Sequence, residues 1–188
     1  MEQQKSKAPL YLLGGVLLSV YALTTPFITP AFRKIILPYV PATAQQQENV
    51  LRFAKDHLSA MTNKKKATNS IDLGSGDGRI TLGIAKACPD TTSVGVELNI
   101  WLVLYSKWAA LRSGQKNAVF HRQDIFTVNL SDYDVISVFG VPSLMDALEG
   151  KLQKELRGDA IVIACRFALP NMKPVYEDTR SEIWIYRK

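Results

Sequence analysis

The stretch IDLGSGDGRI, residues 71–80, sets three glycines at alternate positions between apolar ends. Ile71–Leu73 has the composition of a strand end and Arg79–Lys86 has helical spacing, so the glycines form the turn between a strand and a helix. Glycine permits positive φ and lets a ligand approach the backbone closely. In open α/β sheets ligands bind at the carboxyl ends of strands, so the stretch predicts a binding loop in an α/β fold.

This loop differs from the two common phosphate-binding loops. The dinucleotide fingerprint G-x-G-x-x-G has glycine at its sixth position, where this chain has Arg79, and no Lys-Ser or Lys-Thr pair of a P-loop follows the glycines. Asp72 and Asp77 would repel a pyrophosphate, whereas they suit a ligand with an ammonium, a sulfonium or hydroxyl groups. The sequence therefore predicts a ligand without phosphates at this loop.

A further carboxylate, Glu97, ends the next apolar stretch, SVGVELN. At the end of a second strand a carboxylate can accept both hydroxyls of a ribose. A surface acid is the alternative, although Glu97 interrupts an apolar strand and is followed by Asn99 at a helix start. A ribose without phosphates, attached to a positively charged chain, describes S-adenosylmethionine.

Short apolar runs alternate with amphipathic segments from residue 70 onward. This alternation predicts a parallel sheet with helices on both faces, and a closing pair of strands would add an antiparallel strand. We expect strands at 70–73, 92–96, 118–121, 134–139 and 160–166, helices at about 78–87, 100–113 and 143–156, and a last strand pair at Val175–Tyr176 and Glu182–Tyr186.

The N-terminal part of the chain has a different composition. Residues 10–32 form an uncharged run of 23 residues, which is long enough to cross a bilayer, although Pro26 and Pro30 confine the regular helix to residues 10–25. A retained membrane anchor or targeting segment is favoured, with a cleaved signal or a helix packed on the domain as alternatives. We therefore divide the chain into an anchor or targeting segment at 1–34, a preceding segment and linker at 35–69, and a domain at 70–188.

Charge is distributed unevenly between these parts. Residues 1–66 hold 9 Lys and Arg against 3 Asp and Glu, whereas residues 67–188 hold 14 of each. A neutral domain argues against a nucleic-acid partner, and basic residues beside an apolar run favour an anionic membrane surface. Cys88 and Cys165 lie far apart in the sequence, so we expect reduced thiols in a reducing compartment and no metal site.

The segments DLGSGDGRI and VGVELN resemble the first two motifs of class I, seven-strand S-adenosylmethionine-dependent methyltransferases. The resemblance implies a Rossmann-like seven-stranded sheet and S-adenosylmethionine as cofactor. HRQDIF adds Asp124, which resembles the acidic position that faces the adenine amino group, with a turn aspartate as the alternative. The cofactor-binding residues implied in these motifs are Asp72, Gly74, Ser75, Gly76, Asp77, Gly78, Glu97 and Asp124.

A narrower resemblance covers nearly the whole chain. The segments VYALTTPFITPAFRKIILPYVPAT, QQQENVL, VELNIWLVLYS, FGVPSLMDALEGKLQKEL and DAIVIACRFALP are similar to a family of mitochondrial protein-lysine methyltransferases that act on the ATP synthase c-subunit or the adenine nucleotide translocase. TPFITPAFRK and FGVPSLM favour the c-subunit group. Two departures are Ile100, where the family pattern has proline, and a sequence that stops at IWIYRK.

This resemblance implies an enzyme associated with the mitochondrial inner membrane, with its catalytic domain facing the matrix and a lysine of an inner-membrane protein as substrate. Membrane lipid would be a partner, and nucleic acid would not. Two other hypotheses stay open from the sequence: a methyltransferase of RNA or small molecules, and a membrane-tethered binding module whose loop no longer supports catalysis.

The resemblance also implies that the substrate enters beside the end of the fourth strand, here residues 139–143. The segment FGVPS is not the Asn-Pro-Pro-Tyr type that holds a planar amide or a base amino group. Phe139 and Pro142 are the candidate catalytic residues, lining an amine channel whose apolar walls would lower the pKa of a lysine. A core position is the alternative for Phe139.

Two further groups have open roles. The family resemblance implies that the segment with Thr43 and Gln46 covers the cofactor, whereas a helix beginning near Ala44 would make Thr43 a simple cap. Trp101, Tyr105 and Trp108 recur at helical spacing and are interpreted as a packing stripe rather than as a cage for methyl-lysine.

Overall fold

The computed structural model describes residues 11, 13–21, 42–62 and 67–188 of the 188-residue chain. The chain divides into two units, 1–38 and 39–188. In the first unit residues 13–21 are helical, and the Ser19 hydroxyl donates to the Gly15 carbonyl at 2.8 Å. Much of the apolar run expected at residues 10–32 lies outside the described residues.

None of the helices in the described ranges combines the length and the apolar character needed to span a bilayer.

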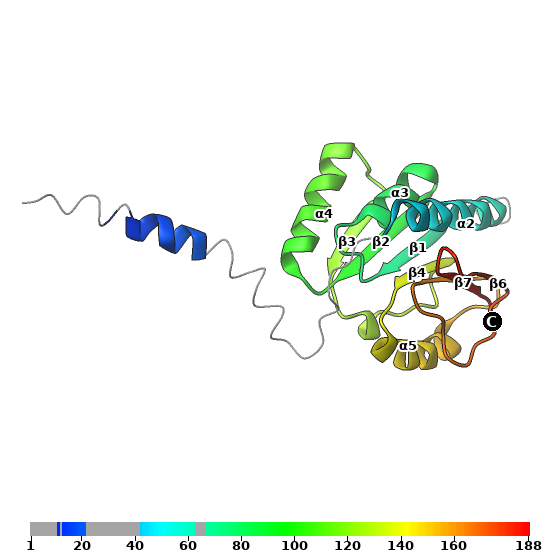
Figure 1. The fold of residues 1–188 in the computed structure, drawn as a ribbon. Helices are drawn as coiled ribbons and strands as arrows, with labels where there is room; N and C mark the ends of the chain where they lie inside the picture. Colours follow the sequence, from blue (N-terminus) through cyan, green and yellow to red (C-terminus); the bar gives the residue numbers. More distant parts are fainter. Residues whose placement is uncertain (1–10, 12, 22–41, 63–66) are drawn as a thin grey trace, which may run out of the picture. The chain divides into compact units, whose positions relative to one another are not determined.

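The second unit is built on a seven-stranded sheet with the strand order β3-β2-β1-β4-β5-β7-β6 (Figure 1). The first five strands in the chain pair in parallel, while β7 is antiparallel to both β5 and β6. Chain order reverses between β1 and β4, which is the position where open sheets form ligand crevices. The strands are β1 (Thr68–Leu73), β2 (Thr91–Glu97), β3 (Ala118–Arg122), β4 (Val135–Phe139), β5 (Ile161–Cys165), β6 (Tyr176–Asp178) and β7 (Ile183–Tyr186).

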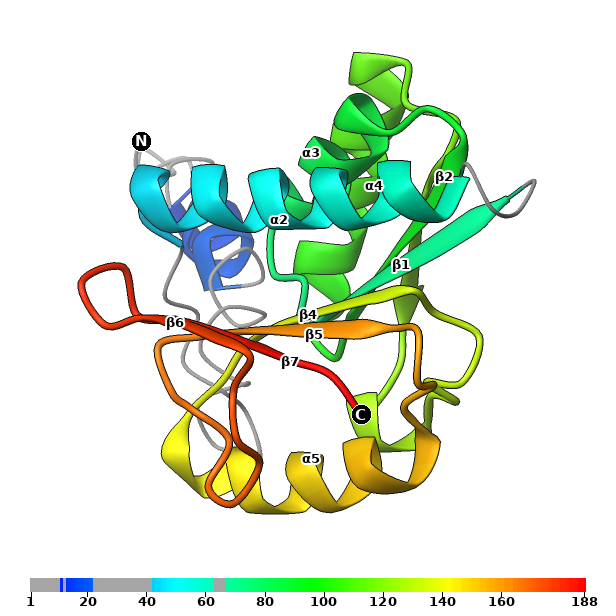
Figure 2. The ribbon, with the colours of Figure 1, turned by 90° about the vertical axis from the view of Figure 1, so that its right-hand side faces the viewer.

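Helices cover both faces of this sheet, as the sequence predicts. Figure 2 shows α2 and α3 on one face and α5 on the other. Leu82 of α3 packs with Val103 of α4 and Phe120 of β3, which places α4 on the same face as α3. The helical segments are α2 (Ala44–Thr62), α3 (Arg79–Ala87), α4 (Ile100–Ser113), the short 3-10 turn η2 (Ile125–Thr127) and α5 (Pro142–Glu155).

Two apolar layers hold the helices to the sheet. On one side Leu148 and Leu152 of α5 pack against strand residues such as Ile136, and all three are fully buried. On the other side Ala54 and Leu58 of α2 are equally buried in a second cluster with strands of the same sheet. Each fully buried Leu or Ile contributes roughly 1.5–3 kcal/mol relative to exposure, so the two layers stabilise the frame on which the loop sits.

A row of hydroxyl groups lies under α2 and α3 within this apolar frame. The hydroxyls of Thr68 and Thr91 are hydrogen-bonded at 2.7 Å, and Ser70 donates to Ser93 at 3.0 Å. These pairs satisfy buried polar groups that would otherwise cost roughly 1–3 kcal/mol each. The row continues along β1 to Asp72, at the edge where the strands end.

Candidate active site

The glycine loop follows β1 and folds over the end of β2. Gly74, Gly76 and Gly78 have φ values of +80°, +54° and +80°, which residues with a side chain adopt only with strain. The N–H groups of Gly74 and Ser75 both donate to the Val96 carbonyl at 2.9 Å, which ties the loop to the neighbouring strand. The Ser75 hydroxyl is buried and has no hydrogen-bond partner among the described residues, as expected of a group left for a ligand.

Close contacts also require glycine at two positions. A Cβ atom added to Gly78 would lie 2.8 Å from the Phe120 ring, and one added to Gly95 of β2 would lie 2.7 Å from it. The Ser106 hydroxyl of α4 donates to the Gly76 carbonyl at 3.2 Å and holds the loop from the other side. Sequence reasoning missed Gly95 and Ser106, although a glycine inside a buried strand signals a close backbone approach.

The Glu97 carboxylate sits between the loop and the start of α4. One oxygen accepts the Gly76 N–H at 3.1 Å and the other accepts the Asn99 N–H at 2.8 Å. Asn99 in turn caps α4 by accepting the Trp101 N–H at 3.0 Å. Each Glu97 oxygen keeps accepting capacity beyond its backbone donor, so the carboxylate fits the two hydroxyls of a ribose.

Asp124 lies beside Glu97 on the next strand end. The Gln123 N–H donates to the Glu97 carbonyl at 3.1 Å, and Asp124 accepts the Phe126 N–H at 2.9 Å as the cap of η2. Leu98 and Phe126 are 40% and 36% exposed and flank the two acidic residues in the chain. Sequence reasoning missed these exposed apolar side chains, which are of a type that can pack against a flat base.

Asp72 is the one deeply buried carboxyl of the site. Its side chain accepts the Ser137 hydroxyl at 2.8 Å and is 3% exposed. Burial raises the pKa of Asp72 to about 7; the Ser137 hydrogen bond lowers it, and the charges of Glu97 and Asp77 raise it further. A carboxyl poised to ionise near neutral pH favours a ligand that brings a positive charge.

Asp77 is paired within the loop. The Arg79 guanidinium donates to both Asp77 carboxylate oxygens, with its shortest contact at 2.6 Å and two more at 3.0 Å. Arg79 also donates to the Ala42 carbonyl at 3.3 Å, before α2 begins. Arginine at the place of the fingerprint's last glycine therefore pairs with Asp77 and joins the loop to the preceding segment.

Comparisons with known proteins decide which family this arrangement belongs to. The model of the ANTKMT methyltransferase domain matches residues 72–176, and the model of the N-terminal domain of the ATP synthase c-subunit lysine N-methyltransferase matches residues 11–33. The chain belongs to the ANTKMT methyltransferase family.

Individual relatives agree with this assignment. The ATP synthase c-subunit lysine N-methyltransferase of Homo sapiens is 44% identical over 178 residues, which cover 93% of this chain and 72% of that protein. The adenine nucleotide translocase lysine N-methyltransferase of Mus musculus is 39% identical over 180 residues, covering 92% and 74%. The predicted protein-lysine methyltransferase class and S-adenosylmethionine as its methyl donor are confirmed.

The fold class is supported by a solved structure. The crystal structure of an RNA methyltransferase from Salinibacter ruber in complex with S-adenosyl-L-homocysteine has a TM-score of 0.64 at 24% sequence identity, covering 79% of this chain and 93% of that chain. At this identity the likeness shows the fold alone. The predicted Rossmann-like seven-stranded sheet is confirmed.

The predicted substrate-entry segment, residues 139–143, connects the end of β4 to the start of α5. Phe139 ends β4, is partly buried and packs against the core cluster under α2. Pro142 is exposed and begins α5. Phe139 therefore contacts the core, as a core residue would, and is also partly exposed, as a channel residue would be. The channel role of Phe139 and Pro142 stays a prediction.

Thr43 and Gln46 form a reciprocal cap at the start of α2. The Thr43 hydroxyl accepts the Gln46 N–H and the Gln46 side chain accepts the Thr43 N–H, both at 3.2 Å. Gln46 is 5% exposed and also donates to Glu182 at 3.3 Å. The capping interpretation of Thr43 is confirmed, and the contact between Arg79 and Ala42 brings this cap near the loop; a role over the cofactor stays a prediction.

The expected aromatic packing stripe is wrong. Trp101, Tyr105 and Trp108 are 45%, 52% and 51% exposed. The spacing correctly puts all three on one face of α4, but the buried face is formed by smaller residues instead, namely Val103, Ser106 and Ala110. A methyl-lysine cage also fits poorly, because the Arg112 guanidinium already lies 5.3 Å above the Trp108 ring.

Proposed function

We propose that this methyltransferase transfers a methyl group from S-adenosylmethionine to a lysine of the ATP synthase c-subunit. The observation that carries the proposal is the Asp72 and Glu97 pair at the reversal point of the sheet, in a chain 44% identical to a protein named for that activity. The adenine nucleotide translocase is the second candidate substrate, because a translocase methyltransferase is 39% identical.

Four features of the chain fit the cofactor. Glu97 would accept its ribose hydroxyls, Asp124 would accept the adenine amino group, and the ionised form of Asp72 would favour its positive charge. The positive φ angles of the loop glycines leave the backbone open to close approach. When bound, S-adenosylmethionine supplies a methyl group that its sulfonium already activates.

The remaining task of the protein is alignment of a neutral lysine. Phe139 and Pro142 would direct the side chain toward the loop from the end of β4, so that the amine reaches the methyl group in line, at about 3 Å. Apolar walls lower the pKa of a lysine, which favours loss of the proton that must leave before attack. Their exclusion of water serves the same step.

We place the enzyme at the mitochondrial inner membrane, with the folded domain facing the matrix. Support comes from the match of residues 11–33 to the N-terminal domain of the c-subunit methyltransferases and from the basic excess of residues 1–66. Deleting residues 1–32 should leave cofactor affinity unchanged and misplace the protein in cells. Arrival of the truncated protein in mitochondria would contradict this role of the segment.

The substrate is tested by mass spectrometry of lysine methylation in cells that lack the protein. We expect methylation of the c-subunit to be lost in these cells. The parent chain and the Glu177→Gln variant should restore it, and the Glu97→Gln variant should not. Glu177 is an exposed acid on β6, away from the cofactor edge, and controls for charge removal. Loss confined to the translocase would assign the second candidate instead.

A further inference from the structure

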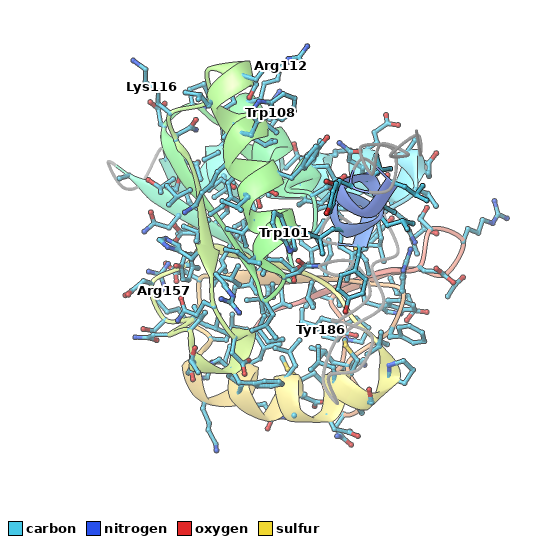
Figure 3. The ribbon with its side chains drawn as sticks, turned by 90° about the vertical axis from the view of Figure 1, so that its left-hand side faces the viewer. Trp101, Trp108, Arg112, Lys116, Arg157 and Tyr186 are labelled. Carbon is cyan, nitrogen blue, oxygen red and sulfur yellow. The ribbon has the colours of Figure 1, made fainter. Side chains whose placement is uncertain are left out.

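One face of α4 exposes large apolar side chains. Trp101, Leu104, Tyr105, Trp108 and Leu111 are between 45% and 82% exposed, and each lies three or four residues from another member of the set. Such spacing puts them in one stripe along the helix. We call these five residues the α4 stripe. Figure 3 shows Trp101 and Trp108 along the helix, with Arg112 and Lys116 toward its C-terminal end.

The stripe is not required for packing of the helix on the domain. α4 is held by the small buried residues on its inner side, by the Asn99 cap, and by the bond from Ser106 to the loop. Isolated exposed apolar residues are ordinary on a protein surface, but a contiguous aromatic stripe marks an interaction site. The stripe thus offers a partner both aromatic rings and neighbouring charges.

The charges within residues 98–123 all have one sign, and the acids Glu97 and Asp124 directly flank this segment in the sequence. Residues 98–123 contain four Lys and Arg and no Asp or Glu, although residues 67–188 as a whole are balanced. The four cations are Lys107, Arg112, Lys116 and Arg122, and all four are exposed. An anionic surface would be attracted to this region, and each Lys or Arg near such a surface adds to binding.

We propose that the α4 stripe docks onto an anionic lipid bilayer. Tryptophan and tyrosine prefer the interface between hydrocarbon and headgroups, where the ring is buried and its polar group stays wet. Both indoles of the stripe are about half exposed, so their N–H groups can stay in contact with water while the cations beside them meet lipid phosphates. A second copy of the chain is disfavoured, because two such faces would bring like charges together.

Docking through α4 would also fix the position of the cofactor edge. Glu97 accepts the Asn99 N–H and Asn99 accepts the Trp101 N–H, so the ribose-binding carboxylate lies at the end of the helix where the stripe begins. A bilayer contact along α4 therefore keeps the mouth of the site close to the lipid surface. This contact belongs to the folded domain, and it is separate from any attachment through residues 1–34.

The test uses full-length protein and phosphatidylcholine vesicles with and without 30% phosphatidylglycerol, prepared with brominated acyl chains that quench nearby tryptophan. The chain has three tryptophans, and Trp184 is partly buried against the core on the α5 side. Trp184→Phe leaves the two stripe reporters, whereas the Trp101→Phe, Trp108→Phe double variant leaves only the core reporter. On anionic vesicles we expect strong quenching of the tryptophan fluorescence of the Trp184→Phe variant and little quenching in the Trp101→Phe, Trp108→Phe double variant.

Charge is tested with a matched pair of variants in the Trp184→Phe background. Lys116→Gln should lower the ratio of docked to undocked stripe about fivefold at low salt, which corresponds to about 1 kcal/mol per cation. Lys173→Gln, an exposed cation elsewhere in the chain, should leave this ratio unchanged.

Equal quenching of the two tryptophan sets would overturn the proposal, as would equal effects of the two lysine variants. A dimer that depends on Trp101 and Trp108, or a stripe covered by residues of the N-terminal unit, would give no lipid quenching and would overturn it as well. Methyl transfer to detergent-extracted c-subunit, measured alongside, reports on the enzymatic proposal independently of the lipid contact.

Discussion

Replacing Asp72 by asparagine should make the cofactor-free protein more stable and the enzyme inactive. The substitution keeps the size of the side chain and an acceptor for the Ser137 hydroxyl, which donates to Asp72 at 2.8 Å. It removes a carboxyl whose pKa burial raises from 3.8 to about 7. The cost of ionising this group in the folded protein is therefore removed.

The size of the effect follows from the pKa shift. A shift of one pKa unit corresponds to 1.36 kcal/mol, so the rise to about 7 amounts to about 4 kcal/mol. Because the folded pKa lies above the unfolded one, the penalty is absent below about pH 4 and grows as pH rises toward 7. Asp72→Asn should raise the free energy of unfolding by about 4 kcal/mol at pH 8 and by roughly 2 kcal/mol at pH 5.

Urea unfolding of the cofactor-free protein at pH 5 and pH 8 measures this difference. Asp90→Asn is the control, because Asp90 is exposed and its replacement should change stability little at either pH. An Asp72→Asn variant no more stable than the parent at pH 8, or favoured equally at both values, would refute the reasoning. The surroundings of Asp72 would then not raise the pKa of its carboxyl toward 7.

Three further predictions follow from contacts of the same edge. In the parent protein, the affinity for S-adenosylmethionine should rise between pH 6 and pH 8, because the positive charge of the ligand favours ionised Asp72. Calorimetry at several pH values measures this affinity, and an affinity that does not change with pH would contradict the prediction. Gly78→Ala should lower the free energy of unfolding by about 2–4 kcal/mol, because the added methyl group clashes with the Phe120 ring and the residue keeps a strained positive φ. Gly114→Ala is the control: it has a similar φ but open space around it, and it should cost only about 1 kcal/mol. Equal losses in the two variants would exclude the clash. Thr43→Ala should cost about 1 kcal/mol through loss of the helix cap, and Thr43→Ser should restore most of it; urea unfolding measures both, and an unchanged alanine variant would mean that the cap adds nothing.

Much of the sheet and the cofactor edge could be predicted because their signals are local in the sequence. Strand and helix boundaries agree within about two residues, and the glycine loop, Glu97 and Asp124 fall at neighbouring strand ends as expected. Periodicity showed that Trp101 and Trp108 share a helix face, but it could not show which face is buried. That choice depends on contacts across the fold, because the face of α4 that meets Phe120 carries the smaller residues Val103 and Ala110.

Long-range contacts account for the other omissions. Nothing local indicates that Arg79 reaches the Ala42 carbonyl, 37 residues earlier in the chain, or that Gly95 makes room for a ring on the next strand. The raised pKa of Asp72 likewise arises from burial in the assembled sheet, where Asp72 meets Ser137 of β4, 65 residues later in the chain. Such contacts can be identified only from the folded structure and not from local sequence patterns.

The hydroxyl row under α2 and α3 also helps to set the register of β1 against β2. In the observed register Ser70 lies opposite Ser93, and Asp72 lies opposite Gly95. Sliding β1 by two residues toward the end of β2 would keep the apolar faces correct, but it would set Ser70 against glycine and Asp72 against Glu97. The shifted register would keep only one hydroxyl pair, Thr68 with Ser93, instead of two, and this loss and the two facing carboxylates both disfavour it. Residues that never meet a substrate thus set the spacing between the two acids that would bind the cofactor.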